Sequence, residues 1–537
     1  MSTTEPSSSA INEWDRLWKI IRDVPDDFNC WEQLIRITEE EGGGITKASS
    51  PETIARLETV YDNFLQKFPL CFGYWKKYAD FELAIHGEQG AEKTFERGVV
   101  AIHNSIDLWN QYIDFKMSHS ASNEDIESLF ERAAACVGLD FLAHPFWDKY
   151  IGFLENRISA DPKRLLALLN RIVLIPMHQY ARYYEKWRGI RNTMSPLEAL
   201  DSETLETFSK EIQQDKGDIS PQEYQIALKE KLDAQTASVY KSTQEGTTVR
   251  WVYEAEIKRS YFHVKPLDKP QLTNWSKYLD FEETQNNYDR IQALYERCLV
   301  PCAQYEDLWL RYGKWLSDNN QLEEAKHAYE RAAFTFLPSN RPNVKIALAL
   351  ILEEQGKIDE ARKVFTALLE SIPNHVETIL NYIHFEKRQD PSSFDYIINT
   401  YIQSNQLDES AKAFFTIQQN TRELYAKSVE LYPSSKFLWM NYINFELGFY
   451  DNLSKDRILQ VFIKARTNLP AESLDTINTL YRDYILERGD SVTALNRKIA
   501  SSTTTTTPIK PNILKRVATD EINSNNNNAT KQARFDA

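Results

Sequence analysis

WKKYADFE, at residues 75–82, decides the fold of this chain, because WSKYLDFE repeats it at residues 275–282. Further copies, some of them degenerate, begin at Trp109, Trp147, Trp309, Ile379 and Trp439. The interval from Trp75 to Trp109 is typical of helix-pair repeats, whose periods are often about 34 residues. The sequence therefore predicts an array of similar units that share one continuous core.

Helical periodicity explains the spacing inside the octapeptide. At about 100° per residue, Trp75, Tyr78 and Phe81 form one apolar stripe along a helix, and Glu82 falls within that stripe. We expect this carboxylate to be buried and to accept hydrogen bonds from an arginine, a tyrosine hydroxyl or a helix N-terminus. The same acid recurs at Glu282, Glu386 and Glu446. Its repetition favours a structural role over a catalytic one.

A second motif follows the first, with the order aromatic, Glu, Arg and small residue. Its copies are TFERG at 94–98, LFERA at 129–133, LYERC at 294–298 and AYERA at 328–332. The small residues allow two helices to approach closely, and the aromatic ring fills the remaining space. Pro69 and Pro433 each precede the next tryptophan by six residues, where a helix must end. Each unit is thus predicted to be helix, turn, helix, turn.

The predicted fold class is all-α, an α-solenoid of helix-pair repeats in two blocks. The repeat-motif residues to which we assign structural roles are Trp75, Tyr78, Phe81, Glu82, Arg97, Trp109, Tyr112, Arg132, Trp147, Tyr150, Trp275, Tyr278, Phe281, Glu282, Arg297, Trp309, Tyr312, Arg331, Tyr382, Glu386, Trp439, Tyr442, Phe445 and Glu446. In the copy at residues 109–116, Lys116 replaces the glutamate of the first motif, so the contact made at this position should differ in that unit.

Composition excludes several classes of protein. Hydrophobic residues make up 42% of the 537 residues, so most of the chain can bury a core. A net charge of −15 disfavours a surface that tracks a phosphate backbone, so RNA should be reached mainly through other proteins. The five scattered cysteines indicate reduced thiols. We find no signal peptide and no run of apolar residues long enough to span a membrane, and we expect no membrane partner.

Lapses of the motif divide the chain into five expected segments. Residues 1–27 are an N-terminal segment that we expect to be partly disordered, and 28–190 form an N-terminal repeat block. Residues 191–248 read as a helical linker, and 249–500 form a C-terminal repeat block. The tail, 501–537, contains TTTTT and NNNN runs and is expected to be disordered.

No catalytic, cofactor or metal site is predicted, and no small-molecule substrate. Zinc-protease, nucleophile-elbow and dinucleotide motifs are absent from the sequence, and the nine histidines do not cluster at ligand spacing. One stretch, ARYYEKWRGIR at 181–191, interleaves basic and aromatic residues that could stack on or clamp RNA. An ordinary helix surface is the alternative. The candidate RNA contacts are Arg182, Lys186, Arg188 and Arg191.

Both motifs resemble the half-a-tetratricopeptide (HAT) repeat, whose first helix carries Trp, Tyr and Glu and whose second carries the aromatic-Glu-Arg-small signature. Within HAT proteins, SYFHVKPLDKPQLTNWSKYLDFEE at 260–283 and YERCLVPCAQYEDLW at 295–309 resemble the pre-mRNA-processing factor 39 family. This resemblance implies a non-enzymatic nuclear scaffold in pre-mRNA splicing, associated with proteins of the U1 small nuclear ribonucleoprotein (U1 snRNP), which recognises the 5′ splice site. It also implies a homodimer formed through the C-terminal repeats.

Two alternatives stay open. The chain could be a HAT scaffold of mRNA 3′-end cleavage and polyadenylation, although the stretches YFHVKPLD and CLVPCAQYE favour splicing. It could also be a helical-repeat subunit of an enzyme complex, which a copurifying catalytic chain would reveal. The unit near 391–433 is shortened and lacks a tryptophan, which leaves the geometry of any dimer open.

Overall fold

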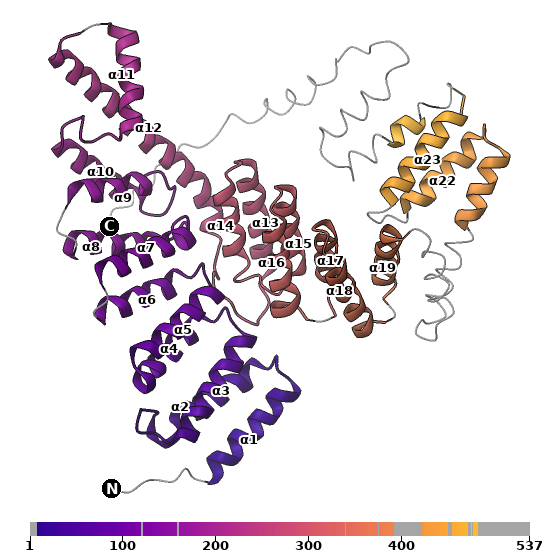
Figure 1. Ribbon diagram of the computed structural model, residues 1–537, viewed down its shortest axis with the longest axis horizontal. Helices are drawn as coiled ribbons and strands as arrows, with labels where there is room; N and C mark the ends of the chain where they lie inside the picture. The colour runs from indigo at the N-terminus through magenta and orange to yellow at the C-terminus, as the bar shows by residue number, and fades with distance from the viewer. Residues whose placement is uncertain are drawn as a thin grey trace, which may run out of the picture. The chain divides into compact units, whose positions relative to one another are not determined.

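The chain forms helices throughout the part that the structure describes, as Figure 1 shows. This computed structural model describes residues 8–119, 122–157, 161–217, 219–338, 340–373, 375–390, 421–448, 454–470, 474 and 476–481. Within these ranges no strand is present. The prediction of an all-α solenoid of helix pairs is confirmed. The predicted tail at 501–537 lies outside the described residues.

In the described residues, ten α-helices begin before the predicted linker. They are α1 (Ser8–Asp23), α2 (Phe28–Glu40), α3 (Pro51–Lys67), α4 (Phe72–His86), α5 (Glu88–Ala101), α6 (Ile106–Ser118), α7 (Asn123–Val137), α8 (His144–Arg157), α9 (Pro162–Ile172) and α10 (Tyr180–Thr193), with a 3₁₀ turn, η1 (Glu41–Gly43), after α2. The Trp motif lies on α4, α6 and α8, and each of these helices packs against the helix that follows it. The predicted alternation of first and second helices is therefore present.

The remaining elements continue this alternation. They are α11 (Ser202–Lys216), α12 (Pro221–Glu254), α13 (Lys269–Thr284), α14 (Tyr288–Cys298), α15 (Glu306–Asp318), α16 (Leu322–Arg331), the π-helical turn η2 (Ala332–Phe336), α17 (Pro342–Glu354), α18 (Ile358–Ser371), α19 (Val376–Gln389), α22 (Lys436–Gly448) and α23 (Ser454–Asn468). Residues 421–431 are helical as well. The copies of the Trp motif lie on α13, α15 and α22.

The turn inside four helix pairs depends on one left-handed residue. Gly87 (φ 77°), Asn286 (φ 54°), Asn320 (φ 62°) and Gly356 (φ 76°) each follow a first helix. Side chains with a Cβ rarely adopt this conformation, with asparagine the most tolerant after glycine. The left-handed residue ends the first helix so that the second can fold back on it.

Five of the buried tryptophans also hold the turn that precedes their helix. The indole Nε1 of Trp75 donates to the carbonyl of Pro69 at 2.9 Å, and that of Trp309 donates to Ala303 at 2.8 Å. Trp31, Trp109 and Trp439 make the same bond to the carbonyl six residues earlier. This bond explains why Pro69 and Pro433 lie six residues before a tryptophan: the residue at that position supplies the carbonyl that accepts from the buried indole. Trp275 differs, since its buried Nε1 finds no acceptor among the described residues.

Part of the N-terminal segment is helical. Residues 8–23 of the expected partly disordered stretch form α1, which packs against α2. Leu17 and Ile21 are buried, and Trp14 stacks on Trp18 with ring centroids 5.3 Å apart. The sequence of α1 has a short apolar face and lacks the repeat motif, so the motif search did not predict this helix.

The predicted linker is helical where the structure describes it, and α11 and α12 occupy most of it. Helix α12 begins at a capping box formed by Ser220 and Glu223 and runs through the expected boundary at residue 248. By its internal packing the chain divides into a unit from Met1 to Thr378 and a second from Ile379 to Ala537. Contacts that α12 and α14 make with earlier helices, described below, explain why the first unit spans both predicted blocks.

The sequence predicted reduced thiols and no membrane-spanning segment. All five cysteines are free, and Cys298 and Cys302 are buried among helices. Among the described helices, none is both long enough and apolar enough to cross a bilayer.

Removal of Trp275 should test the role of the repeated tryptophan. Its side chain is fully buried, so Trp275→Ala should lower the free energy of unfolding by about 3–5 kcal/mol through lost burial and a cavity. Trp251, on α12, is 51% exposed and is the matched control, for which we expect a loss below about 1 kcal/mol. Denaturant melts followed by circular dichroism measure both. Equal losses would contradict the anchor role.

Candidate functional site in the repeat interfaces

One arrangement of three side chains joins successive helix pairs, and Glu296 on α14 illustrates it. The Tyr312 hydroxyl of the next first helix donates to Glu296 at 3.0 Å. The guanidinium of Arg331, on the next second helix, donates two bonds of 2.9 Å to the same carboxylate. The acid of one unit is thus held by the tyrosine and the arginine of the following unit. We call this group the acid–Tyr–Arg set.

The same set recurs along the N-terminal helices. At Glu96 on α5, Tyr112 donates at 2.7 Å and Arg132 donates two bonds of 2.9 Å. The N-terminal sets are Asp62–Tyr78–Arg97, Glu96–Tyr112–Arg132 and Glu131–Tyr150–Arg171. The dipeptides Glu96-Arg97, Glu131-Arg132 and Glu296-Arg297 therefore join three units each, because the acid binds the following unit and the arginine binds the preceding one.

Aromatic rings complete each interface. Phe95, which precedes Glu96 in the motif, stacks on Tyr112 with ring centroids 5.2 Å apart and an interplanar angle of 10°. The guanidinium of Arg132 lies over the ring of Trp109 at 5.7 Å. Equivalent stacks are Phe130–Tyr150 and Tyr295–Tyr312, and equivalent arginine–tryptophan contacts are Arg97–Trp75, Arg297–Trp275 and Arg331–Trp309. These contacts account for the aromatic positions of both motifs.

The small residue that ends the second motif lies against the tryptophan of its own unit. A Cβ added to Gly98 would be 3.1 Å from the ring of Trp75, closer than ordinary packing allows. Ala133, Cys298 and Ala332 occupy the same motif position and are fully buried. A larger residue there would separate the two helices of the pair.

The charged members of a set stabilise each other's ionised form. Burial raises the pKa of Glu296. The charge and hydrogen bonds of Arg331 lower it, as do the charge of His103 and the hydrogen bond from Tyr312. Together these outweigh burial, so the pKa lies below its ordinary value. Burial raises the pKa of Tyr312. Glu296 therefore stays ionised and Tyr312 stays a hydrogen-bond donor at neutral pH, so neither is suited to act as a general acid or base.

Arg297 occupies the most buried version of the set. Its guanidinium donates to Glu254 of α12 at 2.5 and 2.8 Å and lies 3.2 Å from Asp140, in the turn before α8. Opposing carboxylates raise the pKa of Arg297 despite its burial. Asn104, in the turn before α6, also donates to the carbonyl of Glu296 at 2.8 Å. These contacts link helices on both sides of the predicted linker.

Sequence reasoning missed Glu254, although a signal for it exists. Tyr253 and Glu254 repeat the aromatic-Glu half of the second motif, and Tyr253 stacks on Tyr278 with centroids 5.0 Å apart. Ala255 replaces the arginine, so a search for the complete motif passes over this copy. The end of α12 therefore serves as the second helix of the unit that precedes α13.

Beside Arg297 lies a cavity of about 310 Å³, lined largely by apolar side chains such as Ile106, Leu142 and Tyr261. Two of its charged lining residues, Asp140 and Arg297, pair with each other. Burial raises the pKa of Asp140. With its guanidinium committed to two carboxylates, Arg297 is not available to bind a ligand in this cavity.

The acid of the first motif has the expected arginine partners in two units. Glu282 is 2% exposed and binds Arg250 at 2.7 Å and Arg290 at 2.9 Å. Glu446 is fully buried and binds Arg422 and Arg457, each at 2.8 Å. Lys116, which replaces the acid in α6, binds Glu92 at 2.6 Å.

The other motif residues form the cores of their units. Trp75, Trp109, Trp147, Trp275, Trp309, Trp439, Tyr78, Tyr112, Tyr150, Tyr278, Tyr312 and Tyr442 are all buried. Phe81, Phe281, Tyr382, Glu386 and Phe445 are only partly buried. The stripe predicted from the octapeptide is therefore the buried face of the first helix, with Phe81 and its counterparts at the margin.

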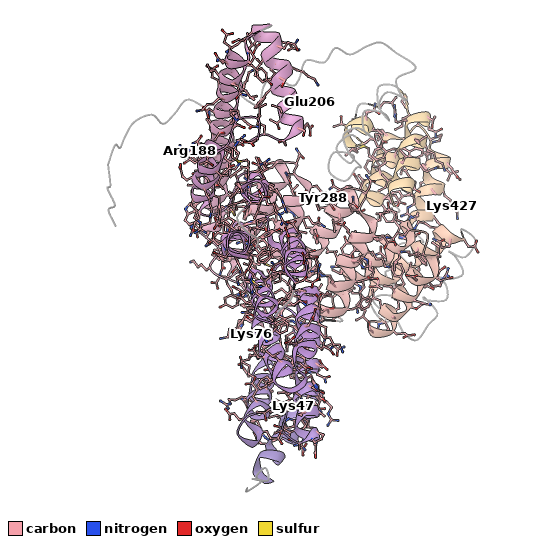
Figure 2. All side chains as sticks on the ribbon, turned by 60° about the vertical axis from the view of Figure 1, so that its left-hand side comes forward. Lys47, Lys76, Arg188, Glu206, Tyr288 and Lys427 are labelled. Atoms are coloured by element: carbon pink, nitrogen blue, oxygen red, sulfur yellow. The ribbon has the colours of Figure 1, made fainter. Side chains whose placement is uncertain are left out.

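The candidate RNA contacts on α10 already have partners within the chain. Arg182 pairs with Asp148, and Lys186 pairs with Glu155 at 2.6 Å. Arg191 is 5% exposed, lies over the Trp187 ring at 4.3 Å and donates to Gln235 and Thr236 of α12. Arg188 is exposed at the surface (Figure 2) and pairs with Glu185 on its own helix. An RNA contact here stays a prediction.

Arg297 and Arg132 provide a matched test, because they hold the same motif position at different depths. Arg297→Ala leaves the buried Glu254 and Asp140 without their cation, so we expect the free energy of unfolding to fall by about 3–5 kcal/mol. The Arg132–Glu96 pair is 49% and 37% exposed, and Arg132→Ala should cost about 1 kcal/mol or less. Urea titrations measure both, and a larger loss for Arg132→Ala would contradict this reading.

Comparison with known proteins agrees with this geometry. Residues 15–189 match the family described as PRP39 N-terminal HAT repeat, and residues 248–388 match PRP39 C-terminal HAT repeat. The chain is 34% identical over 523 residues to pre-mRNA-processing factor 39 of Schizosaccharomyces pombe. The aligned region covers 90% of this chain and 84% of the relative.

Two further relatives extend the comparison. Human pre-mRNA-processing factor 39 is 26% identical over 534 residues, covering 92% of this chain and 78% of the relative. The U1 small nuclear ribonucleoprotein component PRP42 of Saccharomyces cerevisiae is 26% identical over 312 residues, covering 56% of this chain and 57% of the relative. The resemblance seen in the sequence is confirmed, and the chain belongs to the pre-mRNA-processing factor 39 family of HAT-repeat proteins.

Proposed function

We propose that this protein is a non-enzymatic scaffold in pre-mRNA splicing, that it associates with proteins of the U1 snRNP in the nucleus, and that it supports 5′ splice site recognition. Family membership supports the splicing role. The name of the yeast relative, a component of the U1 particle, supports the choice of partner.

The observation that carries the scaffold role is the use of the motif side chains. Glu254, Glu282 and Glu296 are held by arginines within the chain, so their recurrence serves the joints between units and not a reaction. A stack of this kind presents long surfaces on its outer faces, which suit binding to several proteins. The net charge of −15 supports contact with RNA through those proteins.

Affinity capture tests this function. The tagged full-length protein is recovered from nuclear extract with and without nuclease, and bound RNAs and proteins are identified. We expect U1 RNA with its core proteins, and the proteins should stay bound after nuclease treatment. Recovery of polyadenylation factors without U1 would favour the 3′-end alternative, and a stoichiometric catalytic chain would favour an enzyme subunit.

We further propose that the protein forms a homodimer through its C-terminal repeats. Large apolar side chains are exposed in the unit that begins at Ile379, on residues 421–432 and at the start of α22. They are Leu424 (65%), Leu431 (74%), Tyr432 (64%) and Phe437 (74%). Exposed apolar side chains gathered in one short segment of this kind are suited to burial against another protein surface. A second copy of the chain is the occupant that the family resemblance implies.

Charge placed in this cluster should prevent self-association. Phe437→Glu should give a monomer in multi-angle light scattering at concentrations where the unaltered chain is a dimer. Phe334, in η2, is 68% exposed outside this unit, and Phe334→Glu is the matched control, which should stay dimeric. Circular dichroism checks that both variants keep their helices. A dimeric Phe437→Glu variant together with a monomeric control would overturn the assignment.

A further inference from the structure

In two described units, a charged pair 24 residues apart in sequence links a first helix to the second helix before it. In the last unit, Arg422 and Glu446 occupy these positions and bind at 2.8 Å. In α5 and α6 the separation is the same but the charges are reversed, with Glu92 binding Lys116 at 2.6 Å. Opposite charges therefore meet at this point whichever helix carries the cation.

The pair between α3 and α4 breaks this rule, because both positions are acidic. Glu58 and Glu82, the motif acid of α4, have the same separation in sequence as Glu92 and Lys116. Glu82 is 8% exposed, so its carboxylate has lost most of its hydration. Neither Arg nor Lys pairs with Glu82 in the part of the chain that the structure describes. A buried carboxylate in this state is costly unless a cation or a proton accompanies it.

The second arginine is missing too. Arg290 lies eight residues after Glu282 and binds it at 2.9 Å, whereas the residue eight after Glu82 is Gly90. A Cβ built at Gly90 would be 2.8 Å from the Oε2 atom of Glu82. A side chain at this position would meet the carboxylate directly, and glycine leaves the approach to it open.

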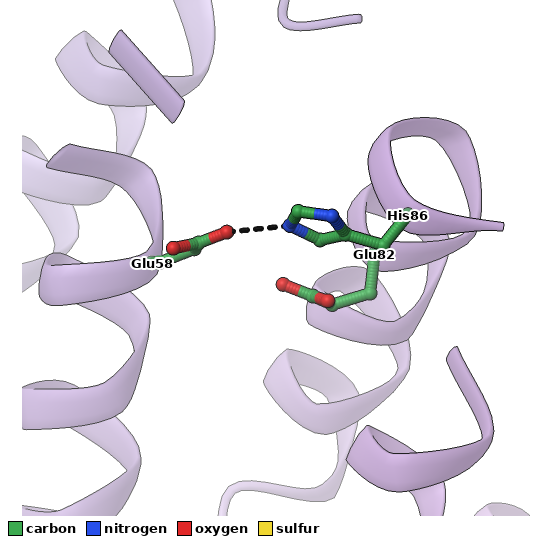
Figure 3. Close-up of side chains that lie close together, drawn as sticks. All are labelled: Glu58, Glu82 and His86. Atoms are coloured by element: carbon green, nitrogen blue, oxygen red, sulfur yellow. Dashed lines mark hydrogen bonds and ion pairs between the residues drawn. The ribbon is translucent and has the colours of Figure 1, made fainter. Parts of the chain in front are cut away.

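A histidine takes the place of the two arginines. His86 lies one turn after Glu82 on α4, and its Nε2 is 2.7 Å from Oε1 of Glu58 on α3. One donor atom from each of Glu58, Glu82 and His86 lies within 4.8 Å of the others. Figure 3 shows the imidazole and both carboxylates converging from the two helices.

The charges around Glu82 act in the same direction. Burial raises the pKa of Glu82, and the negative charges of Glu58 and Asp62 raise it further, while His86 lowers it. The pKa is above its ordinary value as a result. The site therefore favours uptake of positive charge, in contrast to the arginine-balanced sites at Glu282 and Glu446.

We propose that Glu58, Glu82 and His86 bind one divalent transition-metal ion of the Zn²⁺ class, which supplies the positive charge that arginines supply in other repeats. Two carboxylate oxygens and one imidazole nitrogen are donors that Zn²⁺ accepts at about 2.0–2.2 Å. The donors must draw together slightly to reach these distances, and half-exposed His86 and Glu58 can move to do so. Three protein ligands leave a position for water.

Sequence reasoning predicted no metal ligand, because the third donor comes from another helix. Glu82 and His86 are four residues apart and share one face of α4, but Glu58 joins them only through packing of α3 on α4. The ion would clamp these two helices at the joint between two units. This inference does not depend on the proposed role in splicing.

Zinc titration of the full-length protein tests the site. The metal-free chain is titrated with Zn²⁺ by calorimetry in competition with a weak chelator, which suppresses scattered binding by other histidines. His86→Gln should weaken one binding event at least tenfold. His327 is 67% exposed and pairs with Glu330 at 3.2 Å, but no second acid completes a three-ligand group around it in the described residues. His327→Gln is the matched control and should bind Zn²⁺ as the unaltered chain does.

Glu58→Arg separates loss of metal from loss of folding. It recreates the Arg422–Glu446 arrangement, so it should abolish the Zn²⁺ event while the melting temperature stays at or above that of the metal-free chain. Zinc should raise the melting temperature of the unaltered chain and leave that of Glu58→Arg unchanged. Equal zinc affinity in the unaltered chain, His86→Gln and Glu58→Arg overturns the proposal, as does binding of Mg²⁺ as tight as that of Zn²⁺.

Discussion

The fold depends on a carboxylate that no unit can satisfy alone. Glu254 and Glu296 lie largely buried at joints between helix pairs, and the arginine that pairs with each belongs to the following unit. Because a charge at such a joint needs a partner, each unit is completed only by its neighbour. The Trp, Tyr and small-residue positions fit around this pair, which explains why two short motifs recur together.

The sequence predicted which residues form this interface but not how they connect. Periodicity placed Trp75 and Tyr78 on a buried stripe, and both are buried. It could not show that Arg132 binds Glu96, since the two lie 36 residues apart and helical geometry relates only near neighbours. Assignment of a partner needed the stacking of one pair on the next.

Sequence reasoning was less successful where the motif was incomplete. Helix α1 carries tryptophans without the repeat spacing, and the end of α12 carries Tyr253 and Glu254 without the following arginine. The end of α12 was therefore not assigned as a second helix, whereas its Glu254, together with Asp140, binds Arg297. A search that scored the aromatic and the acid alone would have found this joint.

The direction of the acid–Tyr–Arg set has a consequence for synthesis of the chain. Each acid leaves the ribosome about 35 residues before the arginine that neutralises it, as Glu296 precedes Arg331. At about 5–20 residues per second, that interval lasts roughly 2–7 s. During it, the newest helix pair presents an unpaired carboxylate and an uncovered aromatic face. Docking of each pair should therefore trail translation by one unit, with the growing end open to chaperones.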